Sequence, residues 1–197
     1  MRGKQFRSSQ RLSKLVSKRD YDAEEKDTSL LVGLILGGGT IRKSLVSKTS
    51  KHYDHLLYVK NLLEQSGYHC NFKEGDKSCQ QWVLSVSVSA EIAHHYKHQF
   101  YPNGNKTITR HLLNELTNDA LSIWLLLNSH EVDGGLALGT LKFTYDENVI
   151  IQHYFQTVHN LDARLRKSRD KFYIYLTHAS KEALFKKVYV PRSTPCG

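Results

Sequence analysis

The sequence predicts an α+β (mixed α/β) fold built from two similar halves within one chain. Two short apolar segments that begin near Leu31 and Leu121 lie about 90 residues apart, and each has the pattern of a buried helix. Each segment is followed by strand patterns and an amphipathic helix in the same order. Two similar halves in one chain imply a pseudo-twofold molecule. With 197 residues, 40% of them hydrophobic, the chain can bury a substantial core.

The first half opens with a helix over the first apolar segment. Thr28 or Ser29 can cap this helix through its hydroxyl oxygen. Three consecutive glycines, residues 37–39, end it because they lack the side chains that favour a continued helix. The remaining elements of this half are a strand, a helix, the two strands of a hairpin and a closing helix, at residues 40–48, 51–65, 68–73, 80–87 and 89–100.

Residues 101–105, Tyr-Pro-Asn-Gly-Asn, form the clearest break in the chain, because Pro and Asn-Gly favour turns. A short helix at 109–116 and a capping cluster at 117–119 lead into the second apolar helix at 120–128. The elements that follow are a strand, a helix, the two strands of a hairpin and a closing helix, at residues 136–144, 147–160, 163–167, 171–177 and 180–187. We therefore divide the chain into a basic arm with an acidic linker, two αββαββα repeats and a tail, at residues 1–27, 28–104, 105–190 and 191–197.

Basic residues concentrate at the amino terminus of the sequence. Residues 1–19 hold seven Lys and Arg and no acid, which leaves 21 of the 28 basic residues against the 19 acidic ones in the rest of the chain. We expect this arm to lie along nucleic-acid phosphates, with an organellar targeting segment and a solvated tail as the alternatives. The three cysteines form no even set, which favours a reducing compartment. No apolar run reaches the roughly 18 residues of a membrane span, so we expect no membrane partner.

The two apolar segments resemble the motifs of a known family. Residues 30–41, Leu-Leu-Val-Gly-Leu-Ile-Leu-Gly-Gly-Gly-Thr-Ile, resemble the signature helix of the LAGLIDADG homing endonucleases. Residues 121–124, Leu-Ser-Ile-Trp, resemble the opening of the second motif, and residues 105–117 extend the match. The resemblance covers nearly the whole chain after Thr28, and its pattern is that of the single-chain endonucleases of organellar introns.

The resemblance implies a particular arrangement of the two halves. The signature helices would pack side by side at the pseudo-twofold axis, and the antiparallel sheets of both halves would form a saddle that sits in the DNA major groove. Gly33 and Gly37 lie four residues apart, so both would face the partner helix at a close crossing. We expect small residues such as Ser122 or Ser129 opposite them.

The resemblance also implies an acid at the end of each signature helix, where the family holds divalent metal ions over the scissile phosphates. These positions fall on Gly38 and Asn128, and neither residue supplies the carboxylate that such metal ions need. We therefore expect no catalytic residue, no bound metal and no cofactor. Asp133, in an Asp-Gly-Gly sequence, lies five residues further along, a displacement of about 7.5 Å in a helix, and we interpret it as a turn residue.

The outward faces of the strands and the arm supply the candidate binding residues. Basic and aromatic residues of strands 163–167 and 171–177 would share one face, because side chains alternate between the two faces of a strand. A solvated sheet face is the alternative interpretation. The predicted nucleic-acid-binding residues are those of this face, two basic residues of the first half and the seven of the arm: Arg164, Arg166, Lys171, Tyr173, Tyr175, Arg42, Lys73, Arg2, Lys4, Arg7, Arg11, Lys14, Lys18 and Arg19.

Together these features predict a catalytically inactive relative of the homing endonucleases that binds nucleic acid, with RNA preferred over DNA. We expect structured RNA inside an organelle, in the mitochondrial matrix or its counterpart. The protein would be a ribosomal accessory protein, with ribosomal proteins as further partners, or an intron maturase. No homodimer is required, since both repeats lie in one chain. The alternatives are a DNA homing endonuclease or nickase that uses unrecognised acids, and a sequence-specific DNA-binding regulator.

Overall fold

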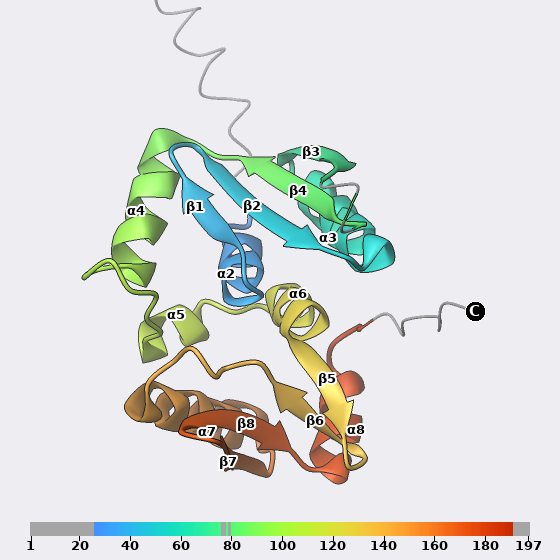
Figure 1. Ribbon diagram of the computed structural model, residues 1–197, viewed down its shortest axis with the longest axis vertical. Coiled ribbons are helices and arrows are strands. Elements are labelled where there is room, and N and C mark those ends of the chain that lie inside the picture. The colour runs from blue at the N-terminus through green and yellow to red at the C-terminus, as the bar shows by residue number, and fades with distance from the viewer. Residues whose placement is uncertain (1–25, 76–77, 79, 191–197) are drawn as a thin grey trace, which may run out of the picture.

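The computed structural model describes residues 26–75, 78 and 80–190, which form two halves of the same architecture (Figure 1). The first half contains α2 (Ser29–Leu36), β1 (Thr40–Arg42), β2 (Leu45–Ser50), α3 (Tyr53–Gln65), β3 (His69–Glu74), β4 (Trp82–Ser87) and α4 (Ala90–Phe100). The second half contains α6 (Asn118–Asn128), β5 (Ser129–Val132), β6 (Gly135–Leu138), α7 (Tyr145–His159), β7 (Ala163–Ser168), β8 (Lys171–Leu176) and α8 (His178–Phe185). The short helix α5 (Arg110–Asn114) lies between them. Each half therefore has the predicted order αββαββα.

Each half contains one four-stranded antiparallel sheet. The strand order is β1-β2-β4-β3 in the first sheet and β5-β6-β8-β7 in the second, so both sheets have the same connectivity. In Figure 1 the sheets lie at opposite ends of the view, and α2 and α6 lie side by side between them. Helices α4 and α5 lie along one side of this pair, and α8 lies on the other side. The predicted α+β class and the paired central helices are confirmed.

Two hairpins replace strands that the sequence analysis predicted as single. Residues 40–48 form β1 and most of β2, which pair around a turn where Lys43 adopts a left-handed backbone with a φ of 51°. Within residues 136–144 only the short β6 is a strand, and it pairs with the unpredicted β5 around Asp133 and Gly134. Asp-Gly is a favoured hairpin turn, so this hairpin carried a sequence signal, whereas Lys43-Ser44 carried none.

The signature helices cross closely at two glycines of α2. A Cβ atom on Gly33 would lie 2.1 Å from the carbonyl oxygen of Ala120, and one on Gly37 would lie 2.8 Å from the Cβ of Leu127. The expected close crossing is therefore present. The facing residues are Ala120 and Leu127, not Ser122 and Ser129. Those two serines instead donate hydrogen bonds to carbonyl oxygens of α6, four residues back.

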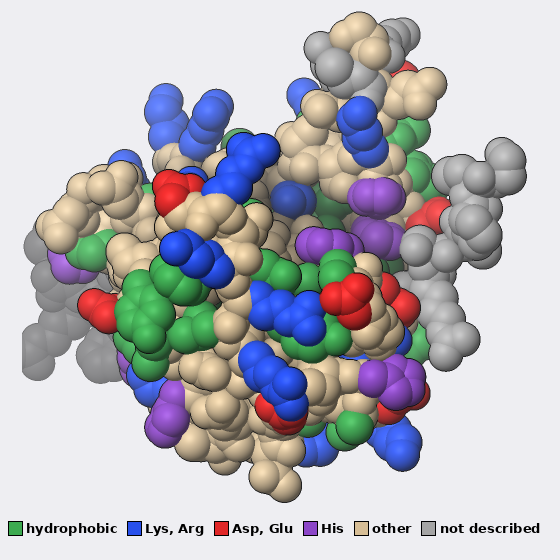
Figure 2. Space-filling model, turned by 60° about the horizontal axis from the view of Figure 1, so that its bottom comes forward, with side chains coloured by type: hydrophobic (Ala, Val, Ile, Leu, Met, Phe, Trp, Pro, Cys, Tyr) green, Lys and Arg blue, Asp and Glu red, His purple; other side chains and the backbone are tan. Residues whose placement is uncertain are grey.

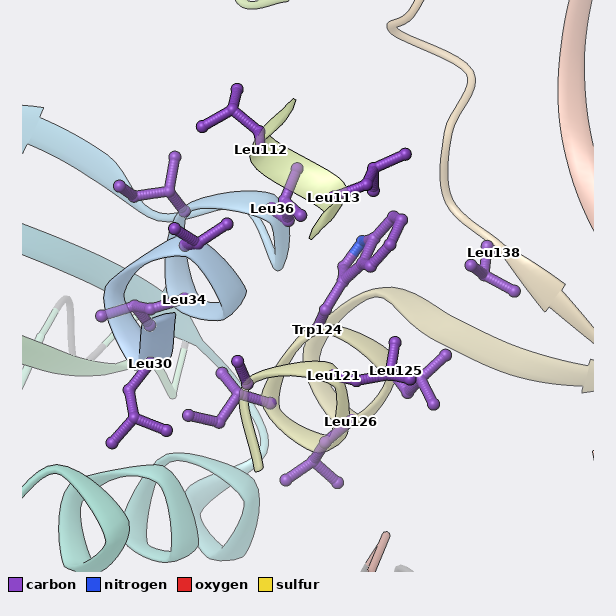
Figure 3. Close-up of a cluster of buried hydrophobic side chains, with 14 of the residues drawn as sticks. Leu30, Leu34, Leu36, Leu112, Leu113, Leu121, Trp124, Leu125, Leu126 and Leu138 are labelled. Carbon is purple, nitrogen blue, oxygen red and sulfur yellow. The ribbon is translucent and has the colours of Figure 1, made fainter. Parts of the chain in front are cut away.

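A shared core joins the two halves. Every residue of α2 is buried, which explains why its sequence is apolar on all sides and not only along one stripe. Figure 3 shows Trp124 extending from α6 toward Leu113 of α5, among leucines of α2, α6 and β6. Because these side chains come from both halves, the described residues fold around one hydrophobic core. None of the described helices is long and apolar enough to cross a membrane.

The amino-terminal ends of the signature helices are linked by their capping residues. The side chain of Thr117 accepts a hydrogen bond from the backbone N–H of Ala120 and so caps α6, as the sequence predicted. Its Oγ1 also lies 2.8 Å from the Oγ of Ser29. The α2 cap differs from the prediction, because the N–H of Ser29 donates to the carboxylate of Asp27 and Thr28 makes no side-chain cap bond. The two helices are therefore fixed to each other at this end.

Candidate nucleic-acid interface

The hairpins that follow the signature helices define which residues of the two halves are equivalent. In each hairpin a two-residue turn separates the strands, after Arg42 in the first half and after Val132 in the second. Counting back from these turns makes Gly38 equivalent to Asn128. The ends of α2 and α6 are in contact at Gly37. The structure therefore places the two positions that the sequence analysis singled out at equivalent points, at the ends of neighbouring helices.

Gly38 and Asn128 both help to direct the chain as it leaves its signature helix. Gly38 has a φ of 98°, a backbone conformation that residues with a side chain rarely adopt. The Nδ2 of Asn128 donates to the carbonyl oxygen of Gly139 at 3.0 Å, and the N–H of Gly139 donates to the carbonyl oxygen of Asn128 at 2.7 Å. Asn128 thus joins the end of α6 to the end of β6, and its side-chain amide nitrogen is engaged in this hydrogen bond.

Lysines gather at the carboxyl-terminal end of α2. The last carbonyl groups of a helix have no partner within the helix and carry a partial negative charge. The ammonium of Lys48, from β2, donates to the carbonyl oxygen of Gly37 at 2.7 Å, and that of Lys106 donates to the carbonyl oxygen of Ile35. Lys142, in the connection after β6, is close enough to repel both ammonium groups. We call Lys48, Lys106 and Lys142 the lysine cluster.

The lysine cluster is strained electrostatically. Burial lowers the pKa of Lys106 to about 7, and repulsion from Lys142 and Lys48 adds to this shift. Burial and repulsion from Lys142 also lower the pKa of Lys48, and burial lowers the pKa of Lys142. These shifts mean that the site disfavours three positive charges in the absence of an anion. An anion bound there would be stabilised by the ammonium groups and would in turn stabilise them.

The residues at the helix ends do not fit the divalent metal ions that the resemblance implies. Gly38 offers no ligand, and the position that its Cβ would occupy lies 2.7 Å from the ammonium nitrogen of Lys48. A divalent cation needs carboxylate oxygens to offset its charge, and a neighbouring ammonium would repel it. Nowhere in residues 26–75, 78 and 80–190 do three or more His, Cys, Asp or Glu side chains form a group that could hold a metal ion. Anion binding suits the charge of this site better than metal binding.

Asp133 lies away from the helix ends. It occupies the turn between β5 and β6, and the four residues of β5 separate it from α6, a distance of about 13 Å along a strand. Its carboxylate accepts a hydrogen bond from the guanidinium of Arg166 at 3.0 Å. In this structure Asp133 is therefore a turn residue and an ion-pair partner.

The second sheet presents the predicted basic and aromatic residues on one face. The register pairs Arg164 with Tyr175, Arg166 with Tyr173, and Ser168 with Lys171, so the five candidates of this sheet share its outward side. Their side chains are not equally accessible to a ligand. The guanidinium carbon of Arg166 lies 3.4 Å from the centre of the Tyr175 ring, and that tyrosine is only 5% exposed.

Both arginines of this face already have acidic partners. Arg164 donates to both carboxylate oxygens of Asp162, at 2.5 to 3.1 Å, and Arg166 donates to Asp133. The pairs are solvent-exposed, so each stabilises the fold by little. A phosphate that binds an arginine here has to compete with a carboxylate, which reduces the electrostatic gain.

The first sheet presents short hydroxyl side chains on its outward face. Arg42 and Lys73 lie on this face, as the register of β1 to β4 shows. Between them the face carries serines and threonines, and the Oγ atoms of Ser47 and Ser85 are 3.0 Å apart. A cavity of about 400 Å³ opens here beside Gly38. It is lined by Gly38, Thr40, Arg42, Ser47, Thr49 and Val83.

The sequence analysis missed the lysine cluster. Lys48 pairs with Leu84 and therefore lies on the inward face of its sheet, where alternation predicts an apolar residue. That exception is a signal, but it emerges only when residues 40–50 are recognised as a hairpin. The equivalent residue of the second half is Leu138. The seven predicted residues of the arm lie outside the described residues.

Figure 2 shows how charge is distributed over one face of the molecule. Lys and Arg side chains are spread over this face, with hydrophobic, polar and acidic groups between them, and they do not form one continuous basic area. This agrees with the small net charge of the chain after residue 19. Binding of a polyanion by this face would therefore depend on individual contacts more than on a general positive field.

Comparison with known proteins gives consistent matches. The model of the LAGLIDADG DNA endonuclease family matches residues 28–184 of the chain. An uncharacterized protein of Methanocaldococcus jannaschii is 28% identical over 176 residues, which cover 83% of this chain and 68% of that protein. The cytochrome b mRNA maturase bI2 of Debaryomyces hansenii is 23% identical over 161 residues, covering 77% of this chain and 61% of the maturase. The chain thus spans about two thirds or less of the length of these relatives.

A solved structure has the same fold. The homing endonuclease I-WcaI, bound to its DNA recognition sequence, superposes with a TM-score of 0.68 over 84% of this chain and 82% of that protein. The two sequences are 20% identical over the match. The predicted architecture of paired helices and two antiparallel sheets is therefore shared with a protein that was solved on DNA.

Proposed function

Because the chain belongs to the LAGLIDADG DNA endonuclease family, a family of nucleic-acid-binding proteins related to homing endonucleases and maturases, we propose that it binds nucleic acid without cutting it. The observation that carries this proposal is the lysine cluster at the end of α2. Where the family resemblance implies a metal-binding acid, the chain has Gly38 and the ammonium of Lys48. The proposal is that lysine ammonium groups hold a phosphate at the place where the endonucleases hold metal ions.

The chemistry of the cluster supports binding more than cleavage. Hydrolysis of a phosphodiester needs an activated water and stabilisation of the leaving oxygen, which family members obtain from carboxylate-bound metal ions. Here neither helix end supplies a carboxylate, and the side-chain amide of Asn128 bonds to Gly139. Ammonium groups can neutralise a phosphate, but they do not bind a water and lower its pKa as a divalent metal does.

We propose structured RNA as the ligand, within an organelle such as the mitochondrion. The similarity to a maturase of a cytochrome b mRNA supports RNA, although the chain covers only 61% of that protein. The hydroxyl-rich face of the first sheet also suits RNA, since serine and threonine can bond to ribose 2′-hydroxyls and phosphates. A role as a ribosomal accessory protein or an intron maturase fits such a ligand, and the basic arm would add phosphate contacts.

A direct comparison of ligands tests this proposal. A folded intron transcript and a DNA duplex of the same sequence are titrated with the full chain, with and without Mg²⁺ or Mn²⁺. We expect tighter binding of the RNA and no new ends in either ligand. Metal-dependent cleavage of the duplex would favour an endonuclease or nickase and overturn the proposal. Saturable binding to one duplex site, tighter than to RNA, would favour a DNA-binding regulator.

The lysine cluster provides the matched variant for the same assay. Lys48→Met should weaken RNA binding and reduce its salt dependence, because one phosphate contact is lost. Lys60→Met is the control, since Lys60 lies on α3, away from the helix ends, and is paired with Glu64. Equal effects of both substitutions would mean that the cluster does not hold a phosphate.

A further inference from the structure

A second cavity lies on the outward face of the second sheet. Its volume is about 200 Å³, which suits a single planar ring system, since drug-sized ligands occupy pockets of about 300–1,000 Å³. Residues of β5, β6, β8, the end of β7 and the connection after β6 surround it. They include His130, Val132, Ala137, Leu141, Ser168 and Tyr173, with Gly139 at the end of β6.

This cavity is the pseudo-symmetric counterpart of the one beside Gly38. The hairpin registers make Thr40 equivalent to His130 and Ser47 equivalent to Ala137, because each pair is counted from the same turn. The same count makes Thr49 equivalent to Gly139 and Val83 equivalent to Tyr173. The first cavity is thus lined mostly by hydroxyl groups and an arginine, whereas the second has aliphatic and small residues, an imidazole, one hydroxyl and a phenol ring. The two halves present different chemistry at the same place.

The small residues of β6 create the space beside the tyrosine. Ala137 pairs with Tyr175, and Gly139 lies one residue beyond the pair of Leu138 and Ile174, next to Tyr173. A side chain at Gly139 would meet the amide oxygen of Asn128 at 2.7 Å, so this position accepts only glycine without a shift. Asn128, at the position where the family resemblance implies an acid, therefore also shapes this cavity.

We propose that this cavity binds one unpaired nucleobase of an RNA, stacked on Tyr173; the inference rests on the proposed function. A base has a flat apolar face that stacks on an aromatic ring, and polar edges that imidazole and hydroxyl groups can bond. The His130 imidazole and the Ser168 hydroxyl supply such groups at the lining. Single-stranded loops and bulges are the parts of RNA whose bases can enter a pocket.

Two basic residues lie next to residues that line this cavity. Arg166 pairs with Tyr173 across β7 and β8, and Lys171 pairs with Ser168 at the end of the same hairpin. Both side chains lie on the outward face, beside the cavity. Arg166 already donates to Asp133, so a phosphate would compete with that carboxylate there, whereas Lys171 lies beside the turn of the hairpin. An aromatic wall, polar edge groups and a neighbouring cation together favour a nucleotide over an apolar side chain of a protein, which would need no cation.

A bulged RNA tests the proposal. The ligand is an RNA stem with one bulged 2-aminopurine, compared with the same stem fully paired. We expect the full chain to bind the bulged stem about tenfold or more tightly than the paired one, and the 2-aminopurine fluorescence to fall on binding. Tyr173→Leu should abolish this preference, while Tyr173→Phe should keep it because the ring remains.

Two further variants control for folding and for position. Ala137→Val adds bulk inside the cavity and should reduce the preference for the bulge, whereas Ala90→Val makes the same change at an exposed position of α4 in the first half and should not. Thermal melts of each variant show that the fold is retained. Equal binding of both stems by the unmodified chain, or a preference that survives Tyr173→Leu, overturns the base-binding inference alone. Binding to neither RNA stem, with retained binding to duplex DNA, overturns the proposed function as well.

Discussion

The ammonium nitrogen of Lys48 lies 2.7 Å from the point where a Cβ atom on Gly38 would be. The same ammonium donates to the carbonyl oxygen of Gly37, so it is held in place by the end of α2. A side chain added at Gly38 would therefore meet a positive charge before it met solvent. This relationship decides how the site should respond when acids are returned to it.

Returning the acids should restore metal binding only if the lysine is removed. Gly38→Asp with Asn128→Asp provides two carboxylates, but the first would pair with Lys48 and would adopt a left-handed backbone that costs about 1–3 kcal/mol. We expect weak Mg²⁺ binding by this double variant and stronger binding when Lys48→Met is added. Calorimetric titration with Mg²⁺ measures both. Equally strong binding by the double and triple variants would show that Lys48 does not oppose the metal.

Gly33→Leu should destabilise the protein strongly. Its Cβ would lie 2.1 Å from a backbone carbonyl oxygen of α6, and backbone cannot move aside as a flexible side chain can. We expect the free energy of unfolding to fall by about 1–3 kcal/mol or more, the usual effect of overpacking. Urea unfolding measures it. The control is Gly104→Asn, where nothing lies within 4 Å and the positive φ suits Asn. A stability unchanged by Gly33→Leu would contradict the observed crossing.

Lys106 should make stability and RNA binding respond to pH in opposite directions. Its pKa is lowered from 10.5 to about 7 in the folded chain, so between these values the unfolded chain binds more protons and stability rises with pH. Below pH 7 the lysine is charged in both states, and its unfavourable contribution is fully present. As pH rises through 7, the loss of its charge should weaken RNA binding. Melts and titrations at pH 6, 7.5 and 9 check both trends.

The control for this pH dependence is Lys106→Met. Lys48 and Lys142 also have lowered pKa values, so part of the trend belongs to them. The variant should show a smaller rise in melting temperature from pH 6 to 9, and a flatter binding curve, than the unmodified chain. Identical pH profiles of variant and unmodified chain would mean that Lys106 titrates at its ordinary value.

The arm and the second sheet should contribute unequally to RNA binding. Removing residues 1–19 takes away seven positive charges, and each lost phosphate contact should lower the slope of log affinity against log salt by about 0.7–0.9. Arg164→Gln with Arg166→Gln should have a smaller effect, because both arginines are already paired with aspartates. Binding at several salt concentrations measures both. Unchanged salt dependence in the truncated chain would assign the arm to targeting or protein contacts.

Much of the fold could be predicted because its signals are local. Ser89 accepts a hydrogen bond from the N–H of Ile92 and caps its helix as predicted, and the second apolar helix begins at its predicted capping cluster. The first hairpin could not be predicted, because its turn depends on a lysine with positive φ, which the sequence does not mark. The crossing at Gly33 was predictable, but the residue opposite it depends on how far one helix slides along the other.

The candidate site was predictable only in part, because much of it is built by contacts between distant parts of the chain. Two-residue alternation correctly grouped the outward residues of β7 and β8, since adjacent strands keep one register over their length. It did not reveal that Arg166 lies over Tyr175 and bonds to Asp133, which belongs to another hairpin. The lysine cluster joins residues from three separate stretches of the chain. No spacing within the sequence brings such residues together.

Lys48 and Leu138 occupy equivalent positions in the two halves, and their difference has a consequence for any ligand that spans both halves. A palindromic ligand would find an ammonium group at the helix end of one half, whereas the equivalent residue of the other half is a leucine buried in the core, so its two arms would be bound differently. The cavities beside Gly38 and Tyr173 differ in their lining residues, so they would also bind the two arms differently. If the chain binds a strand across both halves, as proposed, this asymmetry would favour one direction of the strand over the other.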